Sequence, residues 1–407
     1  MAKGERIDKA AGVDKFEFYG VGRIIFGRGS FARIGELAGQ FGRSAMVISN
    51  AGDVGDAGIV DRLVELLSAG GVRQVFLRQR GEPKVVDVDN ATQIARRDNC
   101  DVVIGLGGGS AMDVAKAVAA LLTNGGGALD YMEIVGKGRK ITRPAAAWIA
   151  VPTTAGTGAE VTRNAVIGCA ERHFKASIRS EHLLARVVLV DPELGVAVRP
   201  EITARAGMDA LCQLIESYTS LGAGTITDAL AIKGIALAAA EKSLLRAYRD
   251  GSDLDARQDM AAAAILSGMT LTSAGLGAAH GFAAPLGANF PIPHGTVCAA
   301  LLPHVISANV AALREQSADH PVLSRYATIG RTLTDQAGLC DSGAINACIR
   351  FVLELACDLN IPPLGEFGLT RNDAPKMVSL ARKSGSMRYN PVNLSDQALA
   401  GILEKAL

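Results

Sequence analysis

The segment from Met260 to Leu313 contains no Asp, Glu, Lys or Arg, although charged residues make up 20% of the chain. It nevertheless contains three of the six histidines, His280, His294 and His304. A membrane-spanning helix needs about 20 predominantly apolar residues in one run. Glycine and proline residues interrupt this run repeatedly, so burial inside the protein is the better interpretation.

A buried imidazole needs a partner, which is a hydrogen-bonding group, a carboxylate or a metal. A single histidine would be interpreted as a satisfied core residue. His280 and His294, however, flank a turn rich in glycine and proline, which indicates a functional site. His304 lies on the expected following helix, and we interpret it as structural.

Length and composition predict two domains and restrict the class of partner. The chain has 407 residues and is 49% hydrophobic, which suffices for more than one core. Its 42 basic and 41 acidic residues give a net charge of +1. Because no basic stripe with interleaved aromatic residues occurs, we expect no nucleic-acid partner.

The cysteines and the N-terminus predict a cytoplasmic protein. The seven cysteines are scattered and include no C-x-x-C pair, which is typical of buried free thiols in a reducing compartment. The first residues alternate charges and contain no apolar signal-peptide region. We expect residues 1–13 to form a flexible extension.

Short apolar runs alternate with amphipathic segments in the first half of the chain only. This pattern predicts a parallel α/β sheet. Strands are expected at 16–18, 23–26, 45–49, 75–77, 101–106, 148–151 and 187–190. Helices alone are expected after residue 195, at 202–220, 227–248, 256–274, 298–312, 324–337, 344–359, 374–384 and 395–407. The predicted fold is an α/β N-terminal domain at 14–195 and an all-α C-terminal domain at 196–407.

A glycine-rich motif, GLGGGSAMDVAK, follows one of the buried strands. Gly107, Gly108 and Gly109 would let backbone amides approach a phosphate closely. Ser110 is a good helix N-cap and Asp113 has capping-box spacing, so the helix start would favour an anion. The spacing fits neither the Rossmann fingerprint nor the P-loop. The motif predicts phosphate or pyrophosphate binding, with a simple glycine turn as the alternative.

Two further segments carry polar groups suited to a ligand. The loop VPTTAGTGAEVT follows another strand and includes Thr153 and Thr154. In GMDALCQLIESY, Asp209 and Gln213 are four residues apart and therefore share one face of a helix. Taken alone, this pair is better interpreted as an aspartate favoured by the helix dipole and an exposed glutamine, but two buried histidines in the same chain favour a site. One carboxylate and two imidazoles are typical ligands of zinc or iron(II).

These segments together resemble the iron-containing (group III) alcohol dehydrogenases of the dehydroquinate synthase-like superfamily. The resemblance rests on GGGSAMDVAK, PTTAGTGAEVT, GMDAL and the segment from His280 to His294-Gly295, in that order. It implies that the fold is an α/β N-terminal dinucleotide-binding domain followed by an all-α C-terminal domain, with the active site in the cleft between the two. It implies that cofactor-binding residues are Asn50, Gly107, Gly108, Gly109, Ser110, Asp113, Thr153, Thr154 and Lys175. It also implies that Asp209, His280 and His294 bind a divalent metal and that Asn164 and Leu276 line the substrate pocket.

Two positions depart from the family pattern. Gln213 stands where the family has a further metal-binding histidine, and Ala284 stands where many members have a histidine linked to proton relay. An amide oxygen is a poorer ligand than imidazole for zinc or iron. We therefore expect metal binding by Asp209, Gln213, His280 and His294 to be weaker than in a three-histidine site.

Asn50 bears on the choice of cofactor. Family members often have an aspartate there, which pairs with the ribose 2′-hydroxyl and repels a 2′-phosphate. Asparagine keeps a hydrogen bond without that repulsion. We expect NAD to be slightly favoured and NADP to be tolerated.

The sequence thus predicts an NAD(P)-dependent alcohol dehydrogenase or aldehyde reductase that acts as a homodimer or larger homo-oligomer. The catalytic residues would be His280, His294 and Gln213, with the substrate oxygen on the metal. One alternative is a metal-independent reductase in which Arg163 recognises an acidic substrate. The others are a dehydroquinate synthase-like lyase and a catalytically impaired NAD-binding protein.

Overall fold

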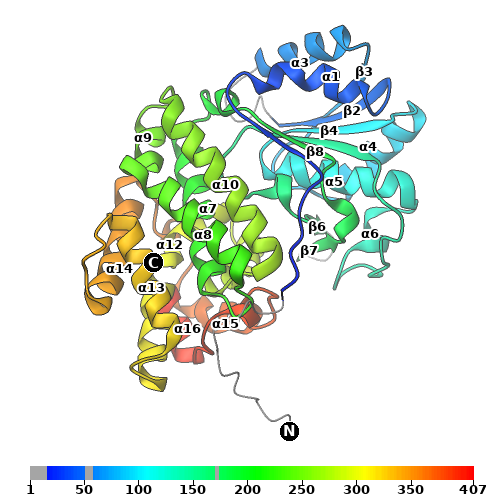
Figure 1. The fold of residues 1–407 in the computed structure, drawn as a ribbon. Helices are drawn as coiled ribbons and strands as arrows, with labels where there is room; N and C mark the ends of the chain where they lie inside the picture. The colour runs from blue at the N-terminus through cyan, green and yellow to red at the C-terminus, as the bar shows by residue number, and fades with distance from the viewer. Residues whose placement is uncertain (1–15, 51–57, 170–173) are drawn as a thin grey trace.

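A computed structural model describes residues 16–50, 58–169 and 174–407. A sheet with its helices forms one half of the molecule and a bundle of helices forms the other (Figure 1). The sheet has six parallel strands in the order β1-β8-β5-β4-β2-β3. The strands are β1 (Ile24–Phe26), β2 (Ser44–Ser49), β3 (Arg73–Arg78), β4 (Val102–Gly107), β5 (Ala147–Pro152) and β8 (Val187–Val190).

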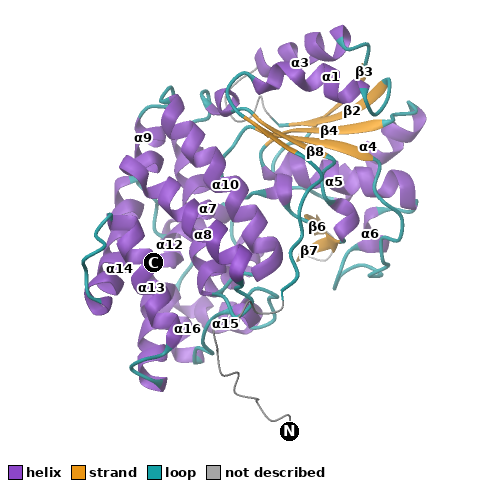
Figure 2. Ribbon diagram, viewed as in Figure 1, coloured by secondary structure: helices purple, strands orange, loops and turns teal. Residues whose placement is uncertain are grey.

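Helices cover both faces of this sheet (Figure 2). The central strands β2 and β4 are buried along their whole length, which explains why their sequences are continuous apolar runs. One face packs against α1 (Ile34–Gly39) and α3 (Gly58–Ala69). The other packs against α4 (Val85–Arg97), α5 (Gly109–Asn124) and the short α6 (Ala128–Tyr131). The α/β prediction is confirmed.

Two details of the sheet prediction are wrong. Residues 16–18 form no strand, because this stretch runs beside the helical half, where the amide of Tyr19 donates to Ser273 Oγ at 3.3 Å. An antiparallel hairpin of β6 (Asn164–Cys169) and β7 (Phe174–Arg179), which packs against α5, was not predicted from the sequence.

Helices alone make up the second half, as predicted. They are α7 (Pro200–Thr219), α8 (Thr225–Ala239), α9 (Ser243–Arg249), α10 (Leu254–Ala274), α11 (Ala278–Asn289), α12 (His294–Gln316), α13 (Pro321–Thr334), α14 (Asp341–Asp358), α15 (Ala374–Ala381) and α16 (Asp396–Lys405). The single helix expected at 227–248 is wrong, because Glu241 and Lys242 adopt positive φ angles of 44° and 61° and separate α8 from α9.

The uncharged segment forms the end of α10, all of α11 and most of α12. Helix α11 was expected to be a turn. It forms because Asn390 and Glu216 accept hydrogen bonds from the amides of Ala278 and Ala279, which the start of a helix leaves unpaired. Helix α12 has the length and apolarity of a membrane span, but 67% of its most apolar window is buried in the protein. This burial is typical of a core helix.

Candidate active site

Helix α7 directs three polar side chains into the helical half. Asp209, Gln213 and Glu216 lie on one face, and their exposed fractions are 1%, 3% and 4%. Buried polar groups of this kind require partners. Each of the three finds its partners within one cluster.

His280 on α11 lies between two of these carboxyl groups. Its Nε2 atom is 3.2 Å from Asp209 Oδ1, and its Nδ1 atom is 2.7 Å from Glu216 Oε2. Glu216 also accepts a hydrogen bond of 2.7 Å from the amide of Ala279. Because Glu216 accepts from Nδ1, it fixes the ring orientation and leaves Nε2 for a ligand.

His294, the first residue of α12, completes the predicted trio. Its Nε2 atom is 3.6 Å from Asp209 Oδ1, and its ring centroid is 5.5 Å from that of His280. The side chain of His294 is 44% exposed, whereas that of His280 is 6% exposed. The cluster is therefore open to solvent on the side of His294.

Cys298 brings a fourth donor atom to this cluster. It lies one turn after His294, and its Sγ atom is 3.6 Å from His280 Nε2 and 3.8 Å from His294 Nε2. The donor atoms of Asp209, His280, His294 and Cys298 all lie within 4.8 Å of one another. Carboxylate, imidazole and thiolate groups at this separation fit a divalent metal such as zinc.

Gln213 uses its amide group within the protein. Its Nε2 atom donates to Asp209 Oδ2 at 3.0 Å, and its Oε1 atom accepts from Ser267 Oγ at 2.8 Å. An ionised carboxylate can only accept hydrogen bonds, so the amide nitrogen must face Asp209. The amide oxygen consequently points to Ser267 on α10.

The charges of the cluster stabilise one another. Burial alone would raise the pKa of Asp209, but the imidazoles of His294 and His280 outweigh burial and lower this pKa. Burial alone would lower the pKa of His280, but the Cys298 sulfur, Asp209 and Glu216 outweigh burial and raise this pKa well above its ordinary value. Without metal, the favoured state is therefore an ionised Asp209 carboxylate beside a protonated His280 imidazole.

The glycine motif lies at the carboxyl end of β4, in the connection to α5. A Cβ atom on Gly107, where φ is 142°, would lie 1.9 Å from Asn50 Oδ1, so only glycine fits. Asn50 Oδ1 accepts a hydrogen bond of 3.0 Å from the amide of Gly108. After β2 the chain continues to one side of the sheet and after β4 to the other, and dinucleotides bind in parallel sheets at such a switch point.

The loop of residues 153–162, which follows β5 and is called the threonine loop below, lies against the same glycines. Cβ atoms added to Gly108 and Gly109 would lie 3.1 Å from Thr154 Oγ1 and 2.9 Å from Thr157 Oγ1. Thr153 Oγ1 is buried and has no hydrogen-bond partner among the described residues. A close-fitting loop with one unpaired hydroxyl fits a bound dinucleotide.

The same loop contacts the helical half through a pair of glycines. A Cβ atom on Gly268 of α10 would lie 2.3 Å from the carbonyl oxygen of Gly158 and 2.8 Å from its Cα atom. Ser267 Oγ, which is hydrogen-bonded to Gln213, also lies 3.4 Å from the carbonyl oxygen of Gly156. The threonine loop is therefore a neighbour of the histidine cluster, which consists of Asp209, His280, His294 and Cys298.

Other predicted cofactor residues have different partners in this structure. The capping box at Ser110 and Asp113 is wrong, because Gly108 is the N-cap of α5. Asp113 instead accepts from the amide of Val166 at 3.1 Å. Lys175 on β7 lies 3.4 Å from a carboxylate oxygen of Glu82.

The predicted substrate-pocket residues lie at the start of β6 and in the connection between α10 and α11. The carbonyl oxygen of Asn164 accepts from buried Lys116 at 2.6 Å, and Leu276 is buried between α10 and α11. The Arg163 guanidinium stacks on the ring of Tyr19 at 3.8 Å. Ala284, one turn after His280, is exposed.

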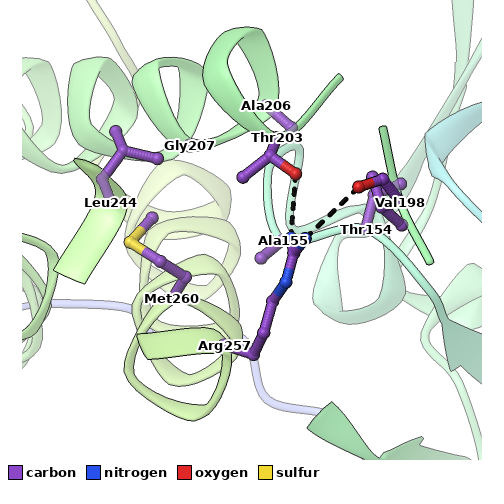
Figure 3. Close-up of a pocket in the computed structure, with 9 residues that line it drawn as sticks. All are labelled: Thr154, Ala155, Val198, Thr203, Ala206, Gly207, Leu244, Arg257 and Met260. Atoms are coloured by element: carbon purple, nitrogen blue, oxygen red, sulfur yellow. Dashed lines mark hydrogen bonds between the residues drawn. The ribbon is translucent and has the colours of Figure 1, made fainter. Parts of the chain in front are cut away.

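A small pocket lies beside the threonine loop, between α7 and α10 (Figure 3). Arg257 spans it and donates to Thr203 Oγ1 at 2.8 Å and to the carbonyl oxygen of Val198 at 3.3 Å. Neither Asp209 nor the two histidines line it. We interpret it as a packing feature and not as the site of chemistry.

Sequence reasoning missed Cys298 and Glu216. Cys298 was grouped with the structural thiols, although its i, i+4 spacing from His294 places both on one helix face. Glu216 is three residues after Gln213 and on the same face of α7. Its role depends on α11, 64 residues further along, which no local pattern indicates.

Comparison with known proteins covers both halves. The family model "Iron-containing alcohol dehydrogenase" matches residues 22–192, and the C-terminal model of the Fe-containing alcohol dehydrogenase family matches residues 203–407. The choline dehydrogenase of Bacillus subtilis is 32% identical over 98% of this chain and 96% of its own length. The 1,3-propanediol dehydrogenase of Klebsiella pneumoniae is 34% identical over 94% of this chain and 96% of its own length.

Solved structures agree with these matches. A crystal structure of a 1,3-propanediol oxidoreductase has a TM-score of 0.89 and 32% identity, and covers 97% of this chain and 100% of its own. The alcohol dehydrogenase from Oenococcus oeni has a TM-score of 0.88 and 30% identity at the same coverage.

Proposed function

The chain belongs to the iron-containing alcohol dehydrogenase family, and on that basis we propose that it transfers hydride reversibly between a small primary alcohol and NAD(P). The observation that carries this proposal is the contact between two sets of residues. The cluster of Asp209, His280 and His294 adjoins the threonine loop that packs on the glycine motif.

Asp209, His280 and His294 would hold a divalent metal. When bound, such a metal acts as a Lewis acid that stabilises negative charge on the substrate oxygen. Glu216 holds the His280 ring, and Gln213 holds the Asp209 carboxylate, so both ligands are oriented in advance. The exposed side of His294 is the entry for substrate.

The cofactor would lie across the carboxyl ends of β2, β4 and β5. Backbone amides at Gly107–Gly109 and the N-terminus of α5 suit the pyrophosphate. Asn50 suits the adenosine ribose, and the unpaired hydroxyl of Thr153 is available to the nicotinamide end. We propose NAD as the preferred cofactor, with NADP tolerated because Asn50 is neutral.

Ala284 has no titratable group, so this position provides no proton relay. Ala284 is exposed, and the exposed edge of His294 also gives access to water. We propose that water on this side exchanges the alcohol proton with solvent.

Two relatives are named as 1,3-propanediol dehydrogenases, and we propose a small neutral alcohol of this kind as the substrate. Arg163 is stacked on Tyr19 and offers no support for an acidic substrate. We also propose a domain division near residue 195, a homodimer or larger oligomer, and a cytoplasmic location.

A cofactor-absorbance assay tests the proposal. Metal-free protein is loaded with Zn²⁺, Fe²⁺ or Mn²⁺ and mixed with NADH or NADPH and a panel of aldehydes. The panel includes acetaldehyde, 3-hydroxypropionaldehyde and betaine aldehyde. Metal-dependent oxidation of the reduced cofactor is expected. No turnover with any aldehyde and metal, despite measurable NADH binding, would contradict the proposed reaction.

A further inference from the structure

The cluster contains one donor atom more than the predicted trio, and two side chains could supply the fourth ligand. One is the Gln213 amide oxygen and the other is the Cys298 thiol. The two candidates differ in what their donor atoms already contact. The inference rests on the proposed metal site, but its test does not depend on dehydrogenase activity.

Gln213 is committed to hydrogen bonds on both sides of its amide group. Its nitrogen donates to Asp209 Oδ2 and its oxygen accepts from Ser267 Oγ. Turning the oxygen towards the metal would break both bonds. Ser267 Oγ would keep the carbonyl oxygen of Ala264 at 2.8 Å as a partner, but buried Asp209 Oδ2 would lose the amide that donates to it. An unpaired buried polar group costs about 1–3 kcal/mol.

The Cys298 sulfur, in contrast, faces both metal-binding nitrogens. Cys298 is fully buried, and its Sγ atom lies 3.6 Å from His280 Nε2 and 3.8 Å from His294 Nε2. Asp209 Oδ1 lies 3.2 Å and 3.6 Å from the same two nitrogens. The sulfur and the carboxylate oxygen therefore bridge the same pair of imidazoles.

These separations match the edges of a tetrahedron around one ion. Zinc bonds of about 2.0–2.2 Å to nitrogen and oxygen and about 2.3 Å to sulfur place tetrahedral donors about 3.3–3.7 Å apart. The four measured edges, between 3.2 and 3.8 Å, lie close to this range.

We propose that Cys298, as a thiolate, is the fourth protein ligand of the metal and that Gln213 is a positioning residue for Asp209. The substrate oxygen would then be a fifth ligand, since catalytic zinc can expand to five-coordinate. The thiol loses its proton to solvent when the sulfur–metal bond forms. A thiolate is a soft ligand, so the site favours Zn²⁺ or Co²⁺ over hard ions such as Mg²⁺ and Mn²⁺.

Cys212 provides a matched control. Its Sγ atom lies 3.7 Å from His280 Nδ1, the nitrogen that faces Glu216, whereas Cys298 faces Nε2. Both thiols are buried beside the same imidazole. Only a metal on the Nε2 side would bond to Cys298.

Titration of metal-free protein with Co²⁺ tests the proposal. Wild type, Cys212→Ser and Gln213→Ala are expected to develop the near-ultraviolet charge-transfer absorption of a cobalt–thiolate bond. Cys298→Ser is expected to lose this absorption completely, with an unchanged circular dichroism spectrum as the check on folding. X-ray absorption of zinc-loaded wild type, which needs no variant, should show a zinc–sulfur distance of about 2.3 Å.

Several results would overturn the inference. The charge-transfer absorption could persist in Cys298→Ser, or it could be lost in Cys212→Ser but not in Cys298→Ser. The zinc or cobalt site of wild type could also prove to have no sulfur ligand. Failure of wild type to bind either metal would overturn it as well. An inactive enzyme that retains the cobalt–thiolate absorption would contradict only the proposed reaction.

Discussion

Replacement of Gly268 by alanine should separate the threonine loop from the histidine cluster. The new Cβ atom would lie 2.3 Å from the carbonyl oxygen of Gly158, 2.6 Å from Val161 Cγ2 and 2.8 Å from Gly158 Cα. Ordinary van der Waals contact begins at 3.4 Å, so the loop or α10 must move by about 1 Å. Two of the three obstructing atoms belong to the backbone and cannot move by a change of rotamer.

This displacement should change both the free energy of unfolding and the reaction rate. Overpacking in a core costs about 1–3 kcal/mol, and the gain from replacing a helical glycine returns about 0.5–1 kcal/mol. The free energy of unfolding should therefore fall by no more than about 2.5 kcal/mol. A misplacement of about 1 Å between reacting groups, however, can lower the rate about 100-fold. Activity should thus suffer far more than stability.

Steady-state rates and urea unfolding measure the two effects separately. Gly401→Ala is the control, because Gly401 also lies in a helix, α16, but a Cβ atom there meets nothing within 4 Å. This control should keep wild-type kcat/KM and gain about 0.5–1 kcal/mol in stability. Wild-type kcat/KM in Gly268→Ala would refute the reasoning, since the loop would then not set the position of the cofactor.

Three further predictions concern single side chains. Glu216→Gln should weaken zinc affinity about 10–100-fold in a chelator competition, because the proposed ligand His280 loses its carboxylate partner; wild-type affinity would mean that Glu216 does not orient His280. Asn50→Asp should lower kcat/KM for NADP and spare NAD, because a carboxylate repels the 2′-phosphate; equal losses with both cofactors would contradict this assignment. Burial raises the pKa of Glu160 from 4.5 to about 7, so the native state holds this proton more tightly and stability falls as pH rises through that interval. In urea unfolding, the stability of Glu160→Gln relative to wild type should accordingly rise by about 3 kcal/mol between pH 4.5 and 8, and a constant difference would disprove the assignment.

The sequence predicted elements whose cause is local. Strands such as β2 and β4 are continuous apolar runs because helices bury both of their faces. Helix α11 was not predicted because the residues that stabilise its first turn are distant in sequence. Gly281 and Pro285 argue locally against a helix, whereas Glu216 and Asn390 hold its first amides from far along the chain.

The candidate site shows the same limit. Asp209, His280 and His294 were found because their residue types and order match a family pattern, and the structure brings them together. The direction of the Gln213 amide could not be predicted, because it depends on Ser267, which is 54 residues away in sequence and on another helix.

The absence of charge from Met260 to Leu313 has a consequence for how such an enzyme can diversify. The acidic groups around the two imidazoles, Asp209 and Glu216, come from α7 alone, and α11 contributes none. The uncharged segment supplies the imidazoles of His280 and His294 but no carboxylate, so mutation of the single helix α7 is enough to change the number of carboxylate charges beside them.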